Sequence, residues 1–145
     1  MRPSLRPIRV RGLIVAALCW GLFGVALWLH PNPSHYGTHT QLGLGACPFL
    51  MRTGLPCVTC GLTTSVSATA HLDLALAWQA NPAGIVLLLG AVVLALAGSG
   101  ELATGRNLLA GLRPKWWAYG LVLGLPMAWA LRLAVGLASG TLPLR

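Results

Sequence analysis

Three long apolar stretches dominate the chain and predict three membrane-spanning helices. They run from residue 12 to 29, from 83 to 100 and from 117 to 138. A helix rises about 1.5 Å per residue, so each stretch can cross roughly 30 Å of hydrocarbon. In lipid each must be helical, because a lone strand would leave its backbone groups without hydrogen-bond partners. We therefore expect an all-α integral membrane fold, with residues 1–145 forming a single membrane domain.

The first stretch also has some features of a cleaved signal peptide. Four arginines precede it, and Gly24-Val25-Ala26 offers a weak cleavage site. Its apolar run, however, is longer than the about 7–15 residues usual for the core of a signal peptide. The pattern therefore favours an uncleaved membrane anchor.

The polar segment between the first two stretches predicts a short helical hairpin. Residues 62–70 form one candidate helix, and Asp73 is a suitable cap for a second. Asn81-Pro82 then breaks the chain before the second span, where proline suits the first turn of a helix. With His71 and Asp73 at its junction, the hairpin is too polar to span alone. We expect it to lie on the membrane surface or to re-enter the membrane.

The composition excludes an ordinary soluble protein. Hydrophobic residues make up 56% of the 145 positions and charged residues only 8%, whereas soluble domains carry about 25% charged residues. Disorder is excluded as well, because disordered chains combine low hydrophobicity with high charge. A lipid bilayer is therefore the expected surrounding.

The cations indicate how the chain is oriented. The net charge is +8, but most cations flank apolar stretches, and no basic run is interleaved with aromatic residues. We therefore expect no nucleic-acid partner. Four arginines precede the first stretch, and Arg106, Arg113 and Lys115 lie between the second and the third. Because cytoplasmic loops are enriched in Lys and Arg, we expect a cytoplasmic N-terminus in a bacterial inner membrane, with residues 30–82 outside.

The chemistry of the chain is concentrated in three cysteines within fourteen residues, Cys47, Cys57 and Cys60. Cys57 and Cys60 precede a predicted helix start, where a thiolate is favoured, so they are candidates for thiol–disulfide exchange with Cys47 as a third thiol. A structural disulfide from Cys47 to either of the others would contribute about 2–3 kcal/mol and would leave one cysteine over.

The same three sulfurs are candidate metal ligands. A histidine would complete a Cys₃His zinc site, and the candidates are His30, His35, His39 and His71, with His71 favoured because it falls between the two short helices. The nearby Met51 also permits Cu(I), which prefers sulfur ligands. Zinc or copper, a structural disulfide and redox chemistry all stay open at this point.

The cysteine segment resembles a family of small bacterial membrane proteins known as domain of unknown function 2752. The shared pattern is CPxxxxTGxPCxxCGxT, followed by two short helices, Asn-Pro and an apolar span, over roughly residues 46–98. The chain departs from it at Val58, where the family usually has proline, and at Thr64, where it usually has arginine. The resemblance implies an architecture and a site, and it implies no activity. The positions that match are Cys47, Pro48, Thr53, Gly54, Pro56, Cys57, Cys60, Gly61, Thr63, Asn81 and Pro82.

Two ionisable groups in the apolar stretches carry further expectations. Arg132, in the third stretch, either extends to the interface or pairs with Asp73. Glu101, near the end of the second, is expected to meet Arg106 or water. The sequence has no serine–histidine–aspartate order, phosphate loop or zinc-protease motif, so no catalytic centre is evident. We expect a role in interaction or assembly, with the bilayer and other membrane proteins as partners.

Overall fold

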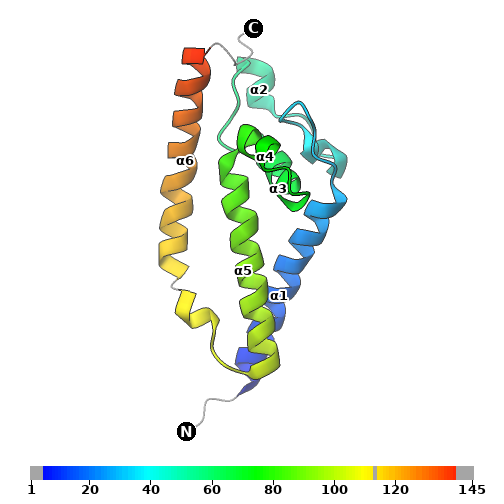
Figure 1. Cartoon of the computed structure of the whole chain (residues 1–145), viewed down its shortest axis with the longest axis vertical. Coiled ribbons are helices and arrows are strands. Elements are labelled where there is room, and N and C mark those ends of the chain that lie inside the picture. The colour runs from blue at the N-terminus through cyan, green and yellow to red at the C-terminus, as the bar shows by residue number, and fades with distance from the viewer. Residues whose placement is uncertain (1–4, 113, 140–145) are drawn as a thin grey trace.

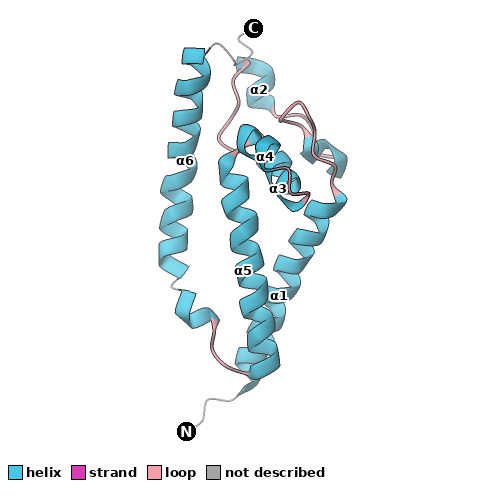
Figure 2. Ribbon diagram, viewed as in Figure 1, coloured by secondary structure: helices cyan, strands magenta, loops and turns pink. Residues whose placement is uncertain are grey.

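The computed structural model describes residues 5–112 and 114–139 and contains only helices and loops over these ranges. The all-α prediction is therefore confirmed for this part of the chain (Figure 2). The elements, in chain order, are α1 (Leu5–Trp28), η1 (Thr38–Leu42), α2 (Pro48–Thr53), α3 (Leu62–Ala70), α4 (Leu74–Ala80), α5 (Pro82–Thr104), η2 (Leu109–Leu112) and α6 (Pro114–Ser139).

The long helices α1 and α5 form the central pair of the fold (Figure 1). They approach closely where glycine faces glycine, because a Cβ at Gly12 would lie 2.7 Å from the carbonyl oxygen of Gly98. Ala16 and Ala95 are buried in the same pair. Small side chains of this kind let two helices approach in lipid. Two segments, Arg6–Trp28 and Pro82–Thr104, are long and apolar enough to cross a membrane.

The third apolar stretch is also helical, as α6, but it does not add a third candidate span among the described residues. Several α6 side chains lie outside the described part of the chain. Two spans rather than three are therefore supported, and the third stays a prediction. In Figure 1 α6 stands beside α5, away from α1, and it carries Pro126 in its interior.

The two ends of the helical assembly differ in character (Figure 1). The lower end joins the start of α1, the end of α5 and the start of α6. The upper end carries what we call the cap, residues 30–81, which contains η1, α2, α3 and α4. This arrangement places all three neighbouring cysteines at one end and Arg11 at the other.

The predicted hairpin is present as α3 and α4, and Asp73 caps α4 by accepting a hydrogen bond from the Leu76 amide at 3.0 Å. The helix α3 is buried between α1 and α5 within the protein, and its position relative to a membrane stays a prediction. Two of its buried hydroxyls donate to backbone carbonyls, Ser67 to Leu29, which directly follows α1, and Thr69 to Ser65. Buried hydroxyls are tolerated when they are hydrogen-bonded in this way.

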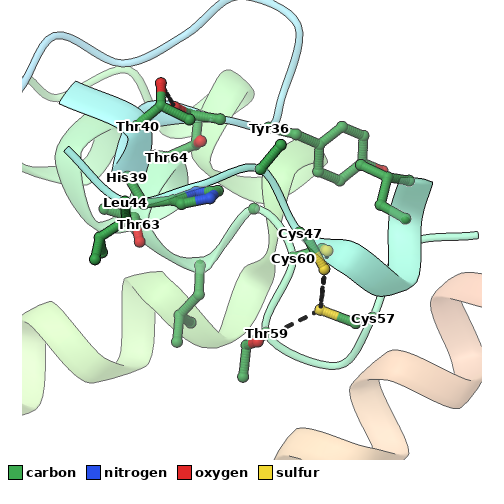
Figure 3. Close-up of a pocket in the computed structure, with 15 residues that line it drawn as sticks. Tyr36, His39, Thr40, Leu44, Cys47, Cys57, Thr59, Cys60, Thr63 and Thr64 are labelled. Carbon is green, nitrogen blue, oxygen red and sulfur yellow. Dashed lines mark hydrogen bonds between the residues drawn. The ribbon is translucent and has the colours of Figure 1, made fainter. Parts of the chain in front are cut away.

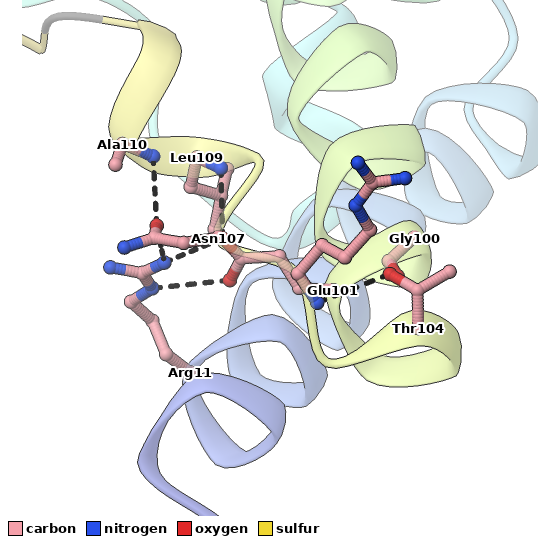
Figure 4. Close-up of polar contacts among 8 residues, drawn as sticks. Arg11, Gly100, Glu101, Thr104, Asn107, Leu109 and Ala110 are labelled. Carbon is pink, nitrogen blue, oxygen red and sulfur yellow. Dashed lines mark hydrogen bonds and ion pairs between the residues drawn. The ribbon is translucent and has the colours of Figure 1, made fainter. Parts of the chain in front are cut away.

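The expected partner of Glu101 was wrong. The Glu101 carboxylate, fully buried, binds the guanidinium of Arg11 on α1 instead of Arg106 (Figure 4). It also accepts a hydrogen bond from the Leu109 amide at 2.8 Å, and Asn107 binds the same guanidinium. A buried carboxylate needs such partners. Because α1 packs against α5, Arg11 lies closer to the Glu101 carboxylate than Arg106 does, although Arg106 is nearer in sequence.

Candidate functional site

The three cysteines of the motif converge although they belong to two separate elements. Cys47 is the N-cap of α2, whereas Cys57 and Cys60 lie in the turn that precedes α3. The helix α2 was not expected inside the cysteine segment. Its signal was nevertheless present, because Pro48 occupies the first turn and Gly54 ends the helix in a left-handed conformation, the usual placement of proline and glycine at helix ends.

The sulfur atoms form one compact group. The Sγ atoms of Cys57 and Cys60 are 2.9 Å apart, and those of Cys47 and Cys57 are 3.5 Å apart. All three lie within 4.8 Å of one another. The cysteines are thiols rather than a disulfide pair in this structure. The Thr59 hydroxyl adds a contact of 3.4 Å to the Cys57 sulfur (Figure 3).

Asn81 holds the turn that carries Cys57 and Cys60. Its Nδ2 atom donates to the carbonyl oxygens of Val58 and Cys60, at 3.2 and 3.3 Å. Its Oδ1 atom accepts from the Ala83 amide and thereby caps α5. The Asn-Pro pair of the motif thus has a physical explanation: Asn81 connects the cysteine turn to the start of a long helix, and Pro82 occupies the first turn of that helix.

The remaining motif residues shape the backbone around the sulfurs. The Thr53 hydroxyl donates to the Phe49 carbonyl and accepts from the Leu55 amide, which closes the end of α2. Pro56 is buried, and its carbonyl oxygen accepts from the Trp129 indole of α6 at 2.8 Å. Thr63 lines the space beside the sulfurs. The motif therefore describes a rigid support for the three thiols.

The electrostatics of the turn distinguish its two cysteines. Partial burial raises the pKa of Cys57, but hydrogen bonds from Cys60, Thr59 and Cys47 outweigh burial and lower this pKa to about 7 from its ordinary value of 9.0. Burial and the hydrogen bond to Cys57 raise the pKa of Cys60 to about 12. Cys57 is thus the thiolate of the pair near neutral pH, and Cys60 is the thiol that stabilises it.

A cavity of about 310 Å³ adjoins the three sulfurs (Figure 3). Its wall includes His39, one of the four candidate histidines but not the favoured one, together with Tyr36 and Thr64. One side of the sulfur cluster therefore faces open space. The arrangement offers thiolate ligands to a soft metal ion and also offers a vicinal thiol pair for disulfide exchange.

The structure does not bring His71 to the cysteines. His71 is the C-cap of α3, at the end of the helix opposite to the cysteine turn. Its Nδ1 atom lies 2.9 Å from the Ser67 carbonyl oxygen, and its ring centroid is 6.5 Å from that of His30. His35 is bound to Gln79. Nine helical residues at about 1.5 Å each separate the two ends of α3. The predicted pair of Asp73 with Arg132 lies outside what is described, because the Arg132 side chain is not among the described residues.

Residues 47–95 match the family described as Protein of unknown function (DUF2752). The match begins at Cys47 and ends within α5, so it covers the cysteine cluster, the hairpin and about a third of the chain. The resemblance expected from the motif is confirmed over this segment. No curated protein and no solved structure matches the chain.

Proposed function

We propose that this chain is a three-span protein of the bacterial inner membrane whose cysteine cluster holds a soft metal ion that braces the cap. The N-terminus would be cytoplasmic, and the cap would lie on the outer side. The two apolar helices α1 and α5 support the membrane assignment. The arginines before the first span support the orientation.

The observation that carries the proposal is the convergence of three sulfurs within 4.8 Å. A disulfide would use two of them and leave the third without a role, whereas a metal ion engages all three. Two thiolates on one zinc ion, each about 2.3 Å from it, are about 3.8 Å apart. The distance of 3.5 Å between Cys47 and Cys57 is close to that spacing, whereas the sulfurs of Cys57 and Cys60, 2.9 Å apart, would separate by about 0.9 Å to admit an ion.

A metal ion at this position would have a mechanical consequence. Cys47 precedes α2, and Cys57 and Cys60 precede α3, so one ion would tie the outer loop to the buried hairpin. Binding to the folded state alone stabilises that state. We expect a braced cap to serve interaction or assembly, with the bilayer and other membrane proteins as partners.

Metal analysis of the purified full chain tests this proposal. The protein in detergent should carry a single zinc or copper ion per chain, measured by elemental analysis. The variants Cys47→Ser, Cys57→Ser and Cys60→Ser should lose it. Cys19→Ser is the matched control, because Cys19 lies inside α1, and it should retain the ion. Metal-free wild-type protein that does not take up zinc or copper would contradict the proposal.

A second candidate function is thiol–disulfide exchange, which the 2.9 Å contact between Cys57 and Cys60 favours. The half-buried Cys57 thiolate would attack a disulfide of a partner protein, form a mixed disulfide and release one partner thiolate. Cys60 would then lose its proton, attack the Cys57 sulfur and release the second partner thiol. The partner disulfide is reduced by two electrons, and Cys57 and Cys60 are oxidised to a disulfide.

Mass mapping of the cysteines in membranes separates the two candidates. Exchange predicts a Cys57–Cys60 disulfide that forms with oxidised glutathione and opens with dithiothreitol, whereas metal binding predicts protection of all three thiols from alkylation until a chelator is added. An impermeant maleimide applied to intact cells tests the side of the membrane. After reduction and chelation, labelling of the cluster only in broken cells would contradict the outward cap.

A further inference from the structure

The fold anchors the segment that carries His39 near the cysteines. It belongs to η1, whose first residue, Thr38, is fully buried and donates to the Thr64 hydroxyl at 2.9 Å. Thr64 lies in the first turn of α3, directly after the turn that carries Cys60. This contact attaches η1 to the cysteine support, and His39 consequently lines the cavity onto which the three sulfurs open (Figure 3).

The hydrogen bond of His39 determines its tautomer. Its Nε2 atom lies 3.1 Å from the carbonyl oxygen of Gly45. A carbonyl oxygen can only accept, so Nε2 carries the proton and Nδ1 carries the lone pair of the neutral ring. Metal-binding histidines have the same arrangement, in which one nitrogen binds the ion and the other donates to a carbonyl or carboxylate.

The other histidines of the cap make contacts away from the cysteine cluster. The Nε2 atom of His35 lies 2.8 Å from the Gln79 side chain. His71 contacts His30 at the end of α3 that is remote from the cysteines. Among the described residues that line the cavity beside Cys47, Cys57 and Cys60, His39 is the histidine.

The segment around His39 also has room to move. The nitrogens of His39 are not part of the group of sulfur atoms, so the segment must approach when an ion binds. Gly43, which ends η1 in a left-handed conformation, and Gly45 both face open space, because a Cβ at either would meet nothing within 4 Å. Glycine permits the backbone change that such an approach requires.

We infer that His39 Nδ1 is the fourth ligand of the metal site and that the resident ion is therefore zinc. This inference rests on the proposed function, since it assumes that the three thiolates bind a metal. Three sulfurs alone suit the low coordination number of Cu(I), whereas three sulfurs and one imidazole form the tetrahedral set of structural zinc. His39 lies outside residues 47–95, the segment that matches the family. This ligand therefore comes from a part of the chain that the family match does not cover.

Metal titration of the full chain in detergent tests the inference, with Co²⁺ as a spectroscopic substitute for zinc. His39→Gln should weaken zinc binding by about 100-fold or more, because loss of a mere supporting partner of a ligand already costs about 10–100-fold. Its Co²⁺ spectrum should lose the intense tetrahedral bands of the wild type. His35→Gln is the matched control, and it should leave zinc affinity and spectrum unchanged.

X-ray absorption of the zinc-loaded wild type provides a second measurement that does not depend on a variant. Three sulfurs and one imidazole nitrogen around zinc support the inference, whereas three sulfurs with water or an added thiol overturn it. Unchanged zinc affinity in His39→Gln also overturns it while leaving the three-cysteine site intact. Failure of the wild type to bind any metal would instead overturn the proposed function, and with it the inference.

Discussion

Arg11, in the second turn of α1, binds the buried carboxylate of Glu101 near the end of α5, ninety residues later in the chain. The Arg11 side chain is 45% exposed, whereas that of Glu101 is 0% exposed. The pair is therefore asymmetric: Arg11 can reach water or lipid headgroups if it loses its partner, and Glu101 cannot. It fastens α1 to α5 at the end of the fold that is remote from the cysteines (Figure 4).

The asymmetry predicts unequal effects of the two single substitutions. Arg11→Leu should lower the free energy of unfolding by about 3 kcal/mol, because it leaves a buried charge without its main partner. Glu101→Leu should cost about 1–2 kcal/mol, mainly through the lost acceptor of the Leu109 amide. The measurement is denaturant unfolding in detergent. The double variant should cost less than the sum of the single ones, and an additive result would show that the pair contributes no coupling.

The close contact of α1 and α5 predicts a steric effect at Gly98. A Cβ there would lie 2.8 Å from the Gly12 carbonyl oxygen, a backbone atom that cannot move without moving the helix. Gly98→Ala should therefore lower stability by about 1–3 kcal/mol. Gly21→Ala in α1 is the control, because a Cβ there meets nothing within 4 Å, and it should be neutral or slightly stabilising. Equal melting temperatures for the two variants would refute the close packing.

The two functions of Asn81 can be separated by substitution. Asn81→Asp keeps an oxygen that caps α5 and loses both donors to the cysteine turn, whereas Asn81→Ala loses all three hydrogen bonds. We expect faster alkylation of the buried Cys60 in both variants, and a larger loss of stability, by about 1 kcal/mol, in Asn81→Ala. Asp73→Asn retains an acceptor for α4 and should leave Cys60 protected. Unchanged Cys60 labelling in Asn81→Asp would mean that the turn does not need these donors.

The pKa values of the cysteine pair predict how alkylation depends on pH in metal-free, reduced protein. Cys57, with a pKa of about 7, should be alkylated at a rate that rises tenfold per pH unit below pH 7 and levels off above it. Cys60, with a pKa of about 12, should stay largely unreactive over the same range. Cys60→Ala removes the thiol that donates to Cys57 and leaves no donor in its place. The inflection of Cys57 should then move upward, towards 9.0.

The same values fix the sign of the pH effect on stability. The pKa of Cys57 is lower in the folded state than its ordinary value, so its contribution is complete above pH 9 and is lost as the pH falls through 7. The raised pKa of Cys60 acts in the opposite direction above pH 9. The free energy of unfolding of the metal-free protein should rise from pH 7 to 9 and then decline, which urea titrations at several pH values would measure. A stability that falls from pH 7 to 9 would contradict the assignment.

Local patterns allowed much of this fold to be predicted. Apolar runs located α1, α5 and α6, and short-range capping signals located α3 and α4, including the cap at Asp73. Both kinds of signal depend on residues that are near one another in sequence. The convergence of the three cysteines was also expected, because a single turn-rich segment carries them.

Contacts between distant segments could not be predicted in this way. Glu101 has Arg106 five residues away, yet it binds Arg11, because helix pairing rather than sequence distance decides which cation is nearest. His39 could not be distinguished from His71 by residue type. Only the contact of Thr38 with Thr64 shows which histidine is carried to the cavity.

Gly61 shows how tightly the main chain of the cap is packed. Its φ angle is +80°, and a Cβ there would lie 2.4 Å from the carbonyl oxygen of Ala80 and 3.0 Å from that of His35. Three stretches of main chain meet at this point with no space for even a methyl group. In a library that samples all twenty amino acids at every position, we expect the variants that keep the three-cysteine site to carry only glycine at position 61. This position would then provide an internal standard for scoring the other positions.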